Sequence, residues 1–121
     1  MSRRIMIAIA AATFLSSGAG AADLPGHGQA RSACLVAAEH STLATMPAAE
    51  LLPEIQLRFN RAVATANEPR AIDNNRPTFL WALEARQACA AAIGYLRGGA
   101  VERDYVAKCD CFHDRMIGHF R

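Results

Sequence analysis

Apolar residues recur at helical spacing on two roughly opposite sides of the stretch from Thr78 to Arg97. The first apolar stripe consists of Phe79, Leu83, Ala90 and Ile93. The second consists of Trp81, Ala85, Ala88, Ala92 and Tyr95. A helix that is apolar on both sides is covered by neighbours on both sides. The pattern therefore predicts a central helix over about 78–97, which carries Cys89 and around which the rest of the chain packs.

Three other segments, about 30–46, 53–66 and 101–120, have the pattern of helices that bury one side. The first has an apolar face made of Leu35, Ala38, Thr42 and Met46. The second has a stripe made of Leu52, Ile55, Phe59, Ala62, Val63 and Ala66. The last has a stripe made of Tyr105, Cys109, Phe112, Met116 and Phe120. No alternating pattern of useful length indicates a strand, so the sequence predicts an all-α domain of four helices.

Proline and glycine mark the connections between these helices. Pro53 suits the first turn of the second helix, where its missing N–H costs no hydrogen bond, after a short turn of helix over 47–52. Residues 67–76 are rich in Asn and Asp and predict one long loop before the central helix. Gly98 and Gly99 predict a left-handed helix end and a tight turn into the last helix.

The N-terminus has the composition of a signal peptide. Two arginines precede an apolar run over 5–15, which is too short to span a bilayer. Small residues follow and form an A-x-A cleavage site that ends at Ala21. We therefore expect a cleaved signal peptide over 1–21 and a single helical domain over 22–121.

Cleavage changes the charge balance of the chain. Arg3 and Arg4 are two of the thirteen basic residues, and all eleven acidic residues lie after Ala21. The exported domain is then electrically neutral, although the whole chain has a formal net charge of +2. A neutral domain without a basic cluster does not fit nucleic acid or an anionic membrane surface. We expect neither as a partner after cleavage.

All four cysteines lie after the predicted cleavage site. An even number of cysteines in a small exported chain indicates a disulfide framework and a periplasmic or secreted location. Cys89 and Cys109 are equally far from Gly99, so they lie level with each other in an antiparallel hairpin that turns there. The preferred pairing is Cys89–Cys109 with Cys34–Cys111. The alternative is Cys34–Cys109 with Cys89–Cys111.

The last helix also offers candidate chemistry. Cys109, Cys111, His113 and Met116 carry groups that suit a soft cation such as Cu(I), and they form an alternative metal site. A disulfide at Cys109 would remove the best ligand of that site. Cys109 and Cys111 could also be a redox dithiol, but they lie mid-helix, away from the helix N-terminus that lowers a thiol pKa. Thiol oxidoreductase is the only enzyme class considered, and we expect no catalytic residue and no cofactor.

Other polar and aromatic positions of the helices have structural interpretations. Asp110 and Asp114 are four residues apart, and we interpret them as like charges on a solvated face. Trp81 and Tyr95 could mark a partner-binding surface, because aromatic residues are enriched at interfaces. On a central helix we expect both in the core.

The segment from Cys89 to Gly98, with Tyr95 between them, resembles a Cys-then-Tyr-then-Gly helix in the Tai family of immunity proteins. Proteins of that family are small, helical, disulfide-containing periplasmic proteins that neutralise secreted toxins. The resemblance implies a protein that binds another exported protein. It covers residues 89–98 alone, the family's closely spaced earlier cysteine is absent, and the Cys-Asp-Cys segment over 109–111 is not part of the family pattern.

The predicted function is therefore that of an exported module that binds a protein or a small ligand, of the immunity, inhibitor or chaperone type. The expected partner is another exported protein. The alternative function is a periplasmic copper-type metal-binding protein that uses Cys109, Cys111, His113 and Met116.

Overall fold

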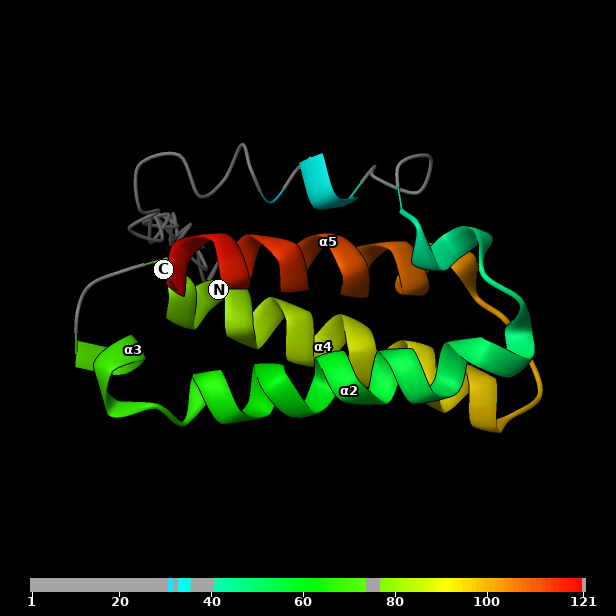
Figure 1. Cartoon of the computed structure of the whole chain (residues 1–121), viewed down its shortest axis with the longest axis horizontal. Coiled ribbons are helices and arrows are strands. Elements are labelled where there is room, and N and C mark those ends of the chain that lie inside the picture. The colour runs from blue at the N-terminus through cyan, green and yellow to red at the C-terminus, as the bar shows by residue number, and fades with distance from the viewer. Residues whose placement is uncertain (1–30, 32, 36–40, 74–76, 121) are drawn as a thin grey trace, which may run out of the picture.

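The computed structural model describes residues 31, 33–35, 41–73 and 77–120 (Figure 1). Every element in this part of the chain is helical, and it contains no strand. The elements are η2 (Leu43–Thr45), α2 (Ala48–Ala66), α3 (Pro69–Asp73), α4 (Thr78–Arg97) and α5 (Arg103–Phe120). The all-α fold and the central helix are confirmed. The predicted signal peptide and the lead-in to the first helix lie outside the described residues.

The three long helices α2, α4 and α5 lie side by side, and α4 packs against both of the others. In Figure 1, α2 and α5 run in the same direction and α4 runs against them. The buried side chains of α4 include Trp81, Ala85 and Ala92. Trp81 lies against Phe112 of α5, with ring centroids 6.0 Å apart. A helix covered on two sides in this way needs apolar residues on both, as its sequence has.

The turn between α4 and α5 is a Schellman motif. Gly98 is the C-cap of α4, and Gly99 has a φ of 82°. The Gly99 N–H donates to the Leu96 carbonyl oxygen, and the Ala100 N–H donates to that of Tyr95. The left-handed conformation needed here is one that an L side chain disfavours. The predicted helix end at the glycine pair is confirmed.

Replacing Gly99 by Ala is expected to lower the free energy of unfolding by about 1–2 kcal/mol, because alanine must take the left-handed conformation. Urea unfolding followed by circular dichroism measures the loss. The control is Gly94→Ala, because Gly94 lies inside α4 and a Cβ added there would point into open space. It should raise stability by up to about 1 kcal/mol, because alanine favours the helix. A loss in the control, or none at Gly99, would contradict this account of the turn.

The helix α2 is longer than the sequence predicted, because it begins at Ala48 and contains Pro53. The proline lacks the N–H that would bond to the preceding turn. Leu51 and Ile55 are fully buried on either side of it. Burial of these two side chains holds both halves of the helix on the core, so the predicted turn of helix over 47–52 is continuous with the helix that follows it.

Two connections also differ from the prediction. The first helix was expected to continue to Met46, but Ser41 and Thr42 are not helical and a short 3-10 turn, η2, follows them. The cause is a tertiary contact of Ser41 with α5. The predicted loop over 67–76 contains the short helix α3, in which Ala71 is buried. Among the described helices, none is long and apolar enough to cross a membrane.

Candidate functional site

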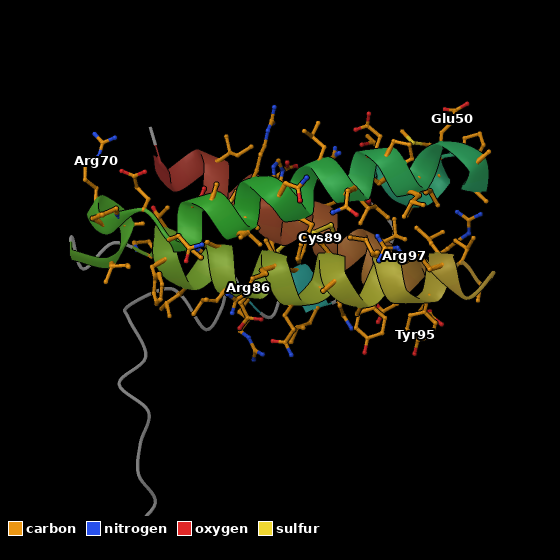
Figure 2. The ribbon with its side chains drawn as sticks, turned by 90° about the horizontal axis from the view of Figure 1, so that it is seen from below. Glu50, Arg70, Arg86, Cys89, Tyr95 and Arg97 are labelled. Atoms are coloured by element: carbon orange, nitrogen blue, oxygen red, sulfur yellow. A yellow bond between two sulfur atoms is a disulfide. The ribbon has the colours of Figure 1, made fainter. Side chains whose placement is uncertain are left out.

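Two disulfides connect the helices. Cys89 of α4 is bonded to Cys109 of α5, with a Cα–Cα distance of 4.6 Å. Cys34 is bonded to Cys111, with a Cα–Cα distance of 5.4 Å. The preferred pairing is confirmed, and the alternative pairing is wrong. Figure 2 shows Cys89 in the interior between the helices.

These bonds decide which cysteine chemistry the structure contains. No described cysteine is free. The sulfur atoms of Cys109 and Cys111 belong to two different disulfides, so neither is a thiolate that could bind a soft cation, and they do not form a dithiol. Residues 31, 33–35, 41–73 and 77–120 contain no group of three or more His, Cys, Asp or Glu side chains that could hold a metal ion. The disulfides indicate an oxidising, extracytoplasmic compartment.

The carboxylate of Asp110 is buried, with 6% of the residue exposed. Its Oδ2 accepts a hydrogen bond from the Ser41 hydroxyl at 2.7 Å and a long one from the Leu43 N–H at 3.5 Å. Its Oδ1 accepts from Nε of Arg58 in α2 at 3.2 Å. The interpretation of Asp110 as part of a solvated acidic face is therefore wrong, although Asp114 is exposed. Asp110 instead joins three elements of the fold.

The Ser41 side chain explains why residues 41 and 42 are not helical. Its hydroxyl donates to Asp110 and accepts the N–H of Ala44, so it caps the 3-10 turn. Arg103 at the start of α5 donates to the carbonyl oxygen of Ala44. These contacts fix the segment from Ser41 to Met46 on α5. These contacts outweigh the helical propensity of the segment, although the helical sequence pattern continues through it.

His113 lies one turn after Asp110 and is also buried, with 4% exposed. Neither of its ring nitrogens has a hydrogen-bond partner. Its Nδ1 lies 3.7 Å from Oδ1 of Asp114. Burial lowers the pKa of His113, the positive charges of Arg58 and Arg61 lower it further, and Asp114 raises it. The ring is thus held neutral inside the fold.

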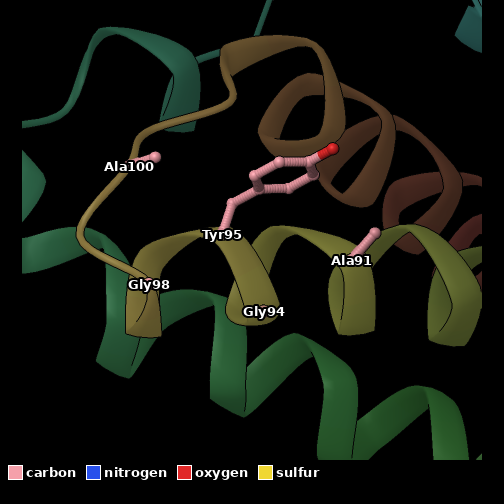
Figure 3. Close-up of a pocket in the computed structure, with 5 residues that line it drawn as sticks. All are labelled: Ala91, Gly94, Tyr95, Gly98 and Ala100. Carbon is pink, nitrogen blue, oxygen red and sulfur yellow. The ribbon is translucent and has the colours of Figure 1, made fainter.

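An open apolar hollow lies at the end of α4. We call it the tyrosine groove, and its lining residues are Ala91, Gly94, Tyr95, Gly98 and Ala100. Its volume is about 310 Å³. Tyr95 is 45% exposed and stands beside this hollow (Figure 3). The expectation that Tyr95 belongs to the core is wrong, whereas the same expectation for Trp81 is confirmed.

Tyr95 is held by a second tyrosine. Its ring stacks on Tyr105 of α5, with centroids 5.6 Å apart and an interplanar angle of 22°. Nζ of Lys108 lies 5.3 Å from the Tyr105 ring centroid, within the range of a cation–π contact. Lys108 also pairs with Asp104, one turn earlier on α5. The aromatic pair therefore lies beside charged groups on its α5 side. The tyrosine groove thus has an ordered aromatic wall.

A second, smaller hollow of about 140 Å³ lies between α4, α5 and the segment of Arg31 and Leu35. Its lining includes Leu35, Gln87, Tyr105 and Lys108. The two hollows together cover one outer face of the α4–α5 hairpin. Along α4 this face runs from Glu84 in the second hollow to Gly98 in the tyrosine groove. At the helical rise, this outer face of the α4–α5 hairpin extends for about 20 Å.

Comparisons with protein-family models, with curated proteins and with solved structures found no match. The resemblance of residues 89–98 to the Tai family therefore remains a prediction. The candidate site rests on the geometry of the tyrosine groove and of the buried polar residues.

Proposed function

We propose that this is an exported binding protein, periplasmic or secreted, that holds a segment of another exported protein on the outer face of the α4–α5 hairpin. The observation that carries the proposal is the tyrosine groove, where the exposed Tyr95, stacked on the half-buried Tyr105, borders an apolar hollow. Tyrosine is enriched at the centres of protein interfaces because it offers a large rigid ring together with a polar hydroxyl.

The form of the groove favours a protein partner over a small ligand. A site for a small molecule encloses most of the ligand's surface. Here the lining comes only from one end of α4 and the turn that follows, which leaves the hollow open (Figure 3). The floor lies close to the backbone because Gly94 and Gly98 have no side chains. Such a shallow hollow suits an apolar side chain presented by a larger partner.

The groove also lies on a part of the fold that a disulfide crosslinks. Tyr95 and Tyr105 belong to the two helices that the Cys89–Cys109 bond connects. A surface that is ordered before binding loses less conformational entropy when the partner arrives. This supports binding as the role of the face, in the same way that rigid helices support designed binding surfaces.

Photo-crosslinking in the exporting cell identifies the partner. Benzoylphenylalanine placed at position 95 should give a covalent adduct with one exported protein, because the ring lies at the groove. The matched control is the same probe at Leu57 of α2, which is 46% exposed but lines neither hollow. The same adducts from both positions, or none from position 95, would reject the tyrosine groove as the site.

Filling the groove should weaken binding of the partner and leave the fold unchanged. Gly94→Leu puts a side chain into open space, since no atom lies within 4 Å of the added Cβ. Leucine also favours a helix over glycine by about 0.5–1 kcal/mol. We expect thermal stability to be kept and affinity for the crosslinked partner to fall at least about tenfold, which corresponds to roughly 1.4 kcal/mol. Isothermal titration calorimetry measures the affinity.

Gly118→Leu is the control for that substitution, because it adds the same side chain into open space on α5. It should leave the affinity unchanged. Equal loss in both variants would mean that added bulk anywhere disturbs the protein, and full binding by Gly94→Leu would mean that the partner contacts another face.

A further inference from the structure

His113 is the buried titratable group that the proposed binding surface does not use. The ring lies in the interior of the fold, and neither nitrogen has a hydrogen-bond partner. A buried polar group without a partner costs free energy, and a buried charge without one costs far more. The site therefore accepts the neutral ring and opposes the protonated one.

The charges around the ring increase this opposition. Arg58 and Arg61 of α2 act on it as positive charges. On its own helix, Asp110 already bonds Arg58 and Ser41, and the side chain of Asp114 is 75% exposed, so water screens its attraction. The buried positions of α4 and the described residues of η2 contain no titratable group. A proton on His113 thus adds a buried cation that Arg58 repels, with a smaller repulsion from Arg61, whose side chain is exposed.

The disulfides determine which helix can separate from the rest of the fold. One disulfide joins α4 to α5, and the other joins the segment that contains Cys34 to α5. The helix α2 has no cysteine, so packing and the ion pair between Arg58 and Asp110 hold it in place. Repulsion across the interface of α2 and α5 therefore acts on α2, the one long helix of the described part of the chain that no disulfide joins to another helix.

We propose that protonation of His113 at mildly acidic pH releases α2 from the disulfide-linked unit of α4 and α5. Release lets water reach the ring and separates the charges. It also exposes the buried side of α2, including Leu51 and Ile55, together with the part of α4 that they cover. The tyrosine groove stays intact because all of its residues belong to the linked unit. The release does not depend on the proposed binding function.

The sign of the pH effect follows from linkage. Above the ordinary histidine pKa of 6.5 the ring is neutral whether the chain is folded or unfolded, so it has no effect on stability. Below it, the unfolded chain takes up a proton that the folded chain resists. The folding equilibrium constant should fall by up to about tenfold for each pH unit below about 6.5, until the pH reaches the lowered pKa of the folded state.

Urea titrations at pH 7, 6 and 5 test the first part of the proposal. The wild-type protein should lose stability over this range, and His113→Phe should lose much less, because phenylalanine fills the site and does not titrate. His119→Phe, on the same helix, is the control and should behave as the wild type does. Equal losses in the wild type and His113→Phe, or a loss abolished by His119→Phe, would overturn the proposal.

Hydrogen exchange on the wild-type protein tests which helix is released and needs no variant to fold. After correction for the intrinsic effect of pH on exchange, protection over 48–66 should fall from pH 7 to pH 5 while protection near Cys89 and Cys109 is retained. Equal loss in all three helices, or no loss in α2, would overturn the proposal. NMR titration of the His113 ring should give a midpoint that coincides with the loss of α2 protection.

Discussion

Removing the bond between Cys34 and Cys111 is expected to destabilise the fold more than removing the bond between Cys89 and Cys109. The first closes a loop of 77 residues and the second a loop of 20. Chain entropy assigns about 4.5 kcal/mol to the first and about 3.3 kcal/mol to the second. Paired Cys→Ala variants, unfolded in guanidinium chloride, give the two free energies.

The dependence of stability on denaturant gives a second comparison. The slope m reports the surface exposed on unfolding, and a crosslink that closes a long loop keeps the unfolded chain compact. We expect m to rise in both variants and to rise more when Cys34 and Cys111 are replaced. An unchanged m, or the opposite order, would contradict the loop-entropy account and would place the effect of the bonds in packing of the native state.

The second large effect is expected at Asp110. Replacing it by Ala removes the acceptor of two buried donors, Nε of Arg58 and the hydroxyl of Ser41. Breaking a buried ion pair costs about 3–5 kcal/mol, and we expect about 3 kcal/mol here, because Arg58 is 18% exposed and keeps its bond to Glu54. Thermal or urea unfolding at pH 7 measures the loss.

Asp114→Ala is the matched control for Asp110→Ala, since it removes the same group one turn later at an exposed position. It should change stability by no more than about 0.5 kcal/mol. Hydrogen exchange adds a local measurement: Asp110→Ala should also deprotect the amides over 41–46, which that carboxylate holds on α5. Similar losses in both variants would mean that Asp110 has no special role in joining the elements.

The features that the sequence predicted best are those set by local rules. The two apolar stripes of α4 required neighbours on both sides, and the glycine pair required a turn. Equal spacing of Cys89 and Cys109 from that turn then favoured the first disulfide, and with it the preferred pairing of all four cysteines. Each inference needed only helical periodicity and the rise per residue.

The buried polar positions of α5 were missed because they depend on a distant residue. A second stripe on this helix consists of Val106, Asp110, His113 and Ile117. It has the spacing of a core stripe, and its two apolar members could have revealed it. The polar members suggested a solvated face, since the partner of Asp110 is Arg58, which lies 52 residues earlier in the chain.

Tyr95 was assigned to the core for a related reason. Periodicity gives the direction in which a side chain points, but it does not give the point at which the neighbouring helix ends. Here α5 begins only at Arg103, after the turn, and its first residues do not cover the last turn of α4. Tyr95 therefore stacks on Tyr105 at the edge of the helix pair and remains half exposed. The candidate site therefore matches the alternative interpretation of Tyr95, as part of a partner-binding surface, and not the preferred one.

The nested arrangement of the two disulfides has a consequence for survival among extracytoplasmic proteases. The bond between Cys89 and Cys109 lies within the loop that the bond between Cys34 and Cys111 closes. A single cut of the backbone at any position from Cys34 to Cys111 leaves both pieces covalently connected. A cleaved molecule then gains one water in mass and loses no segment of this loop, so a protease must cut it twice before any part can diffuse away.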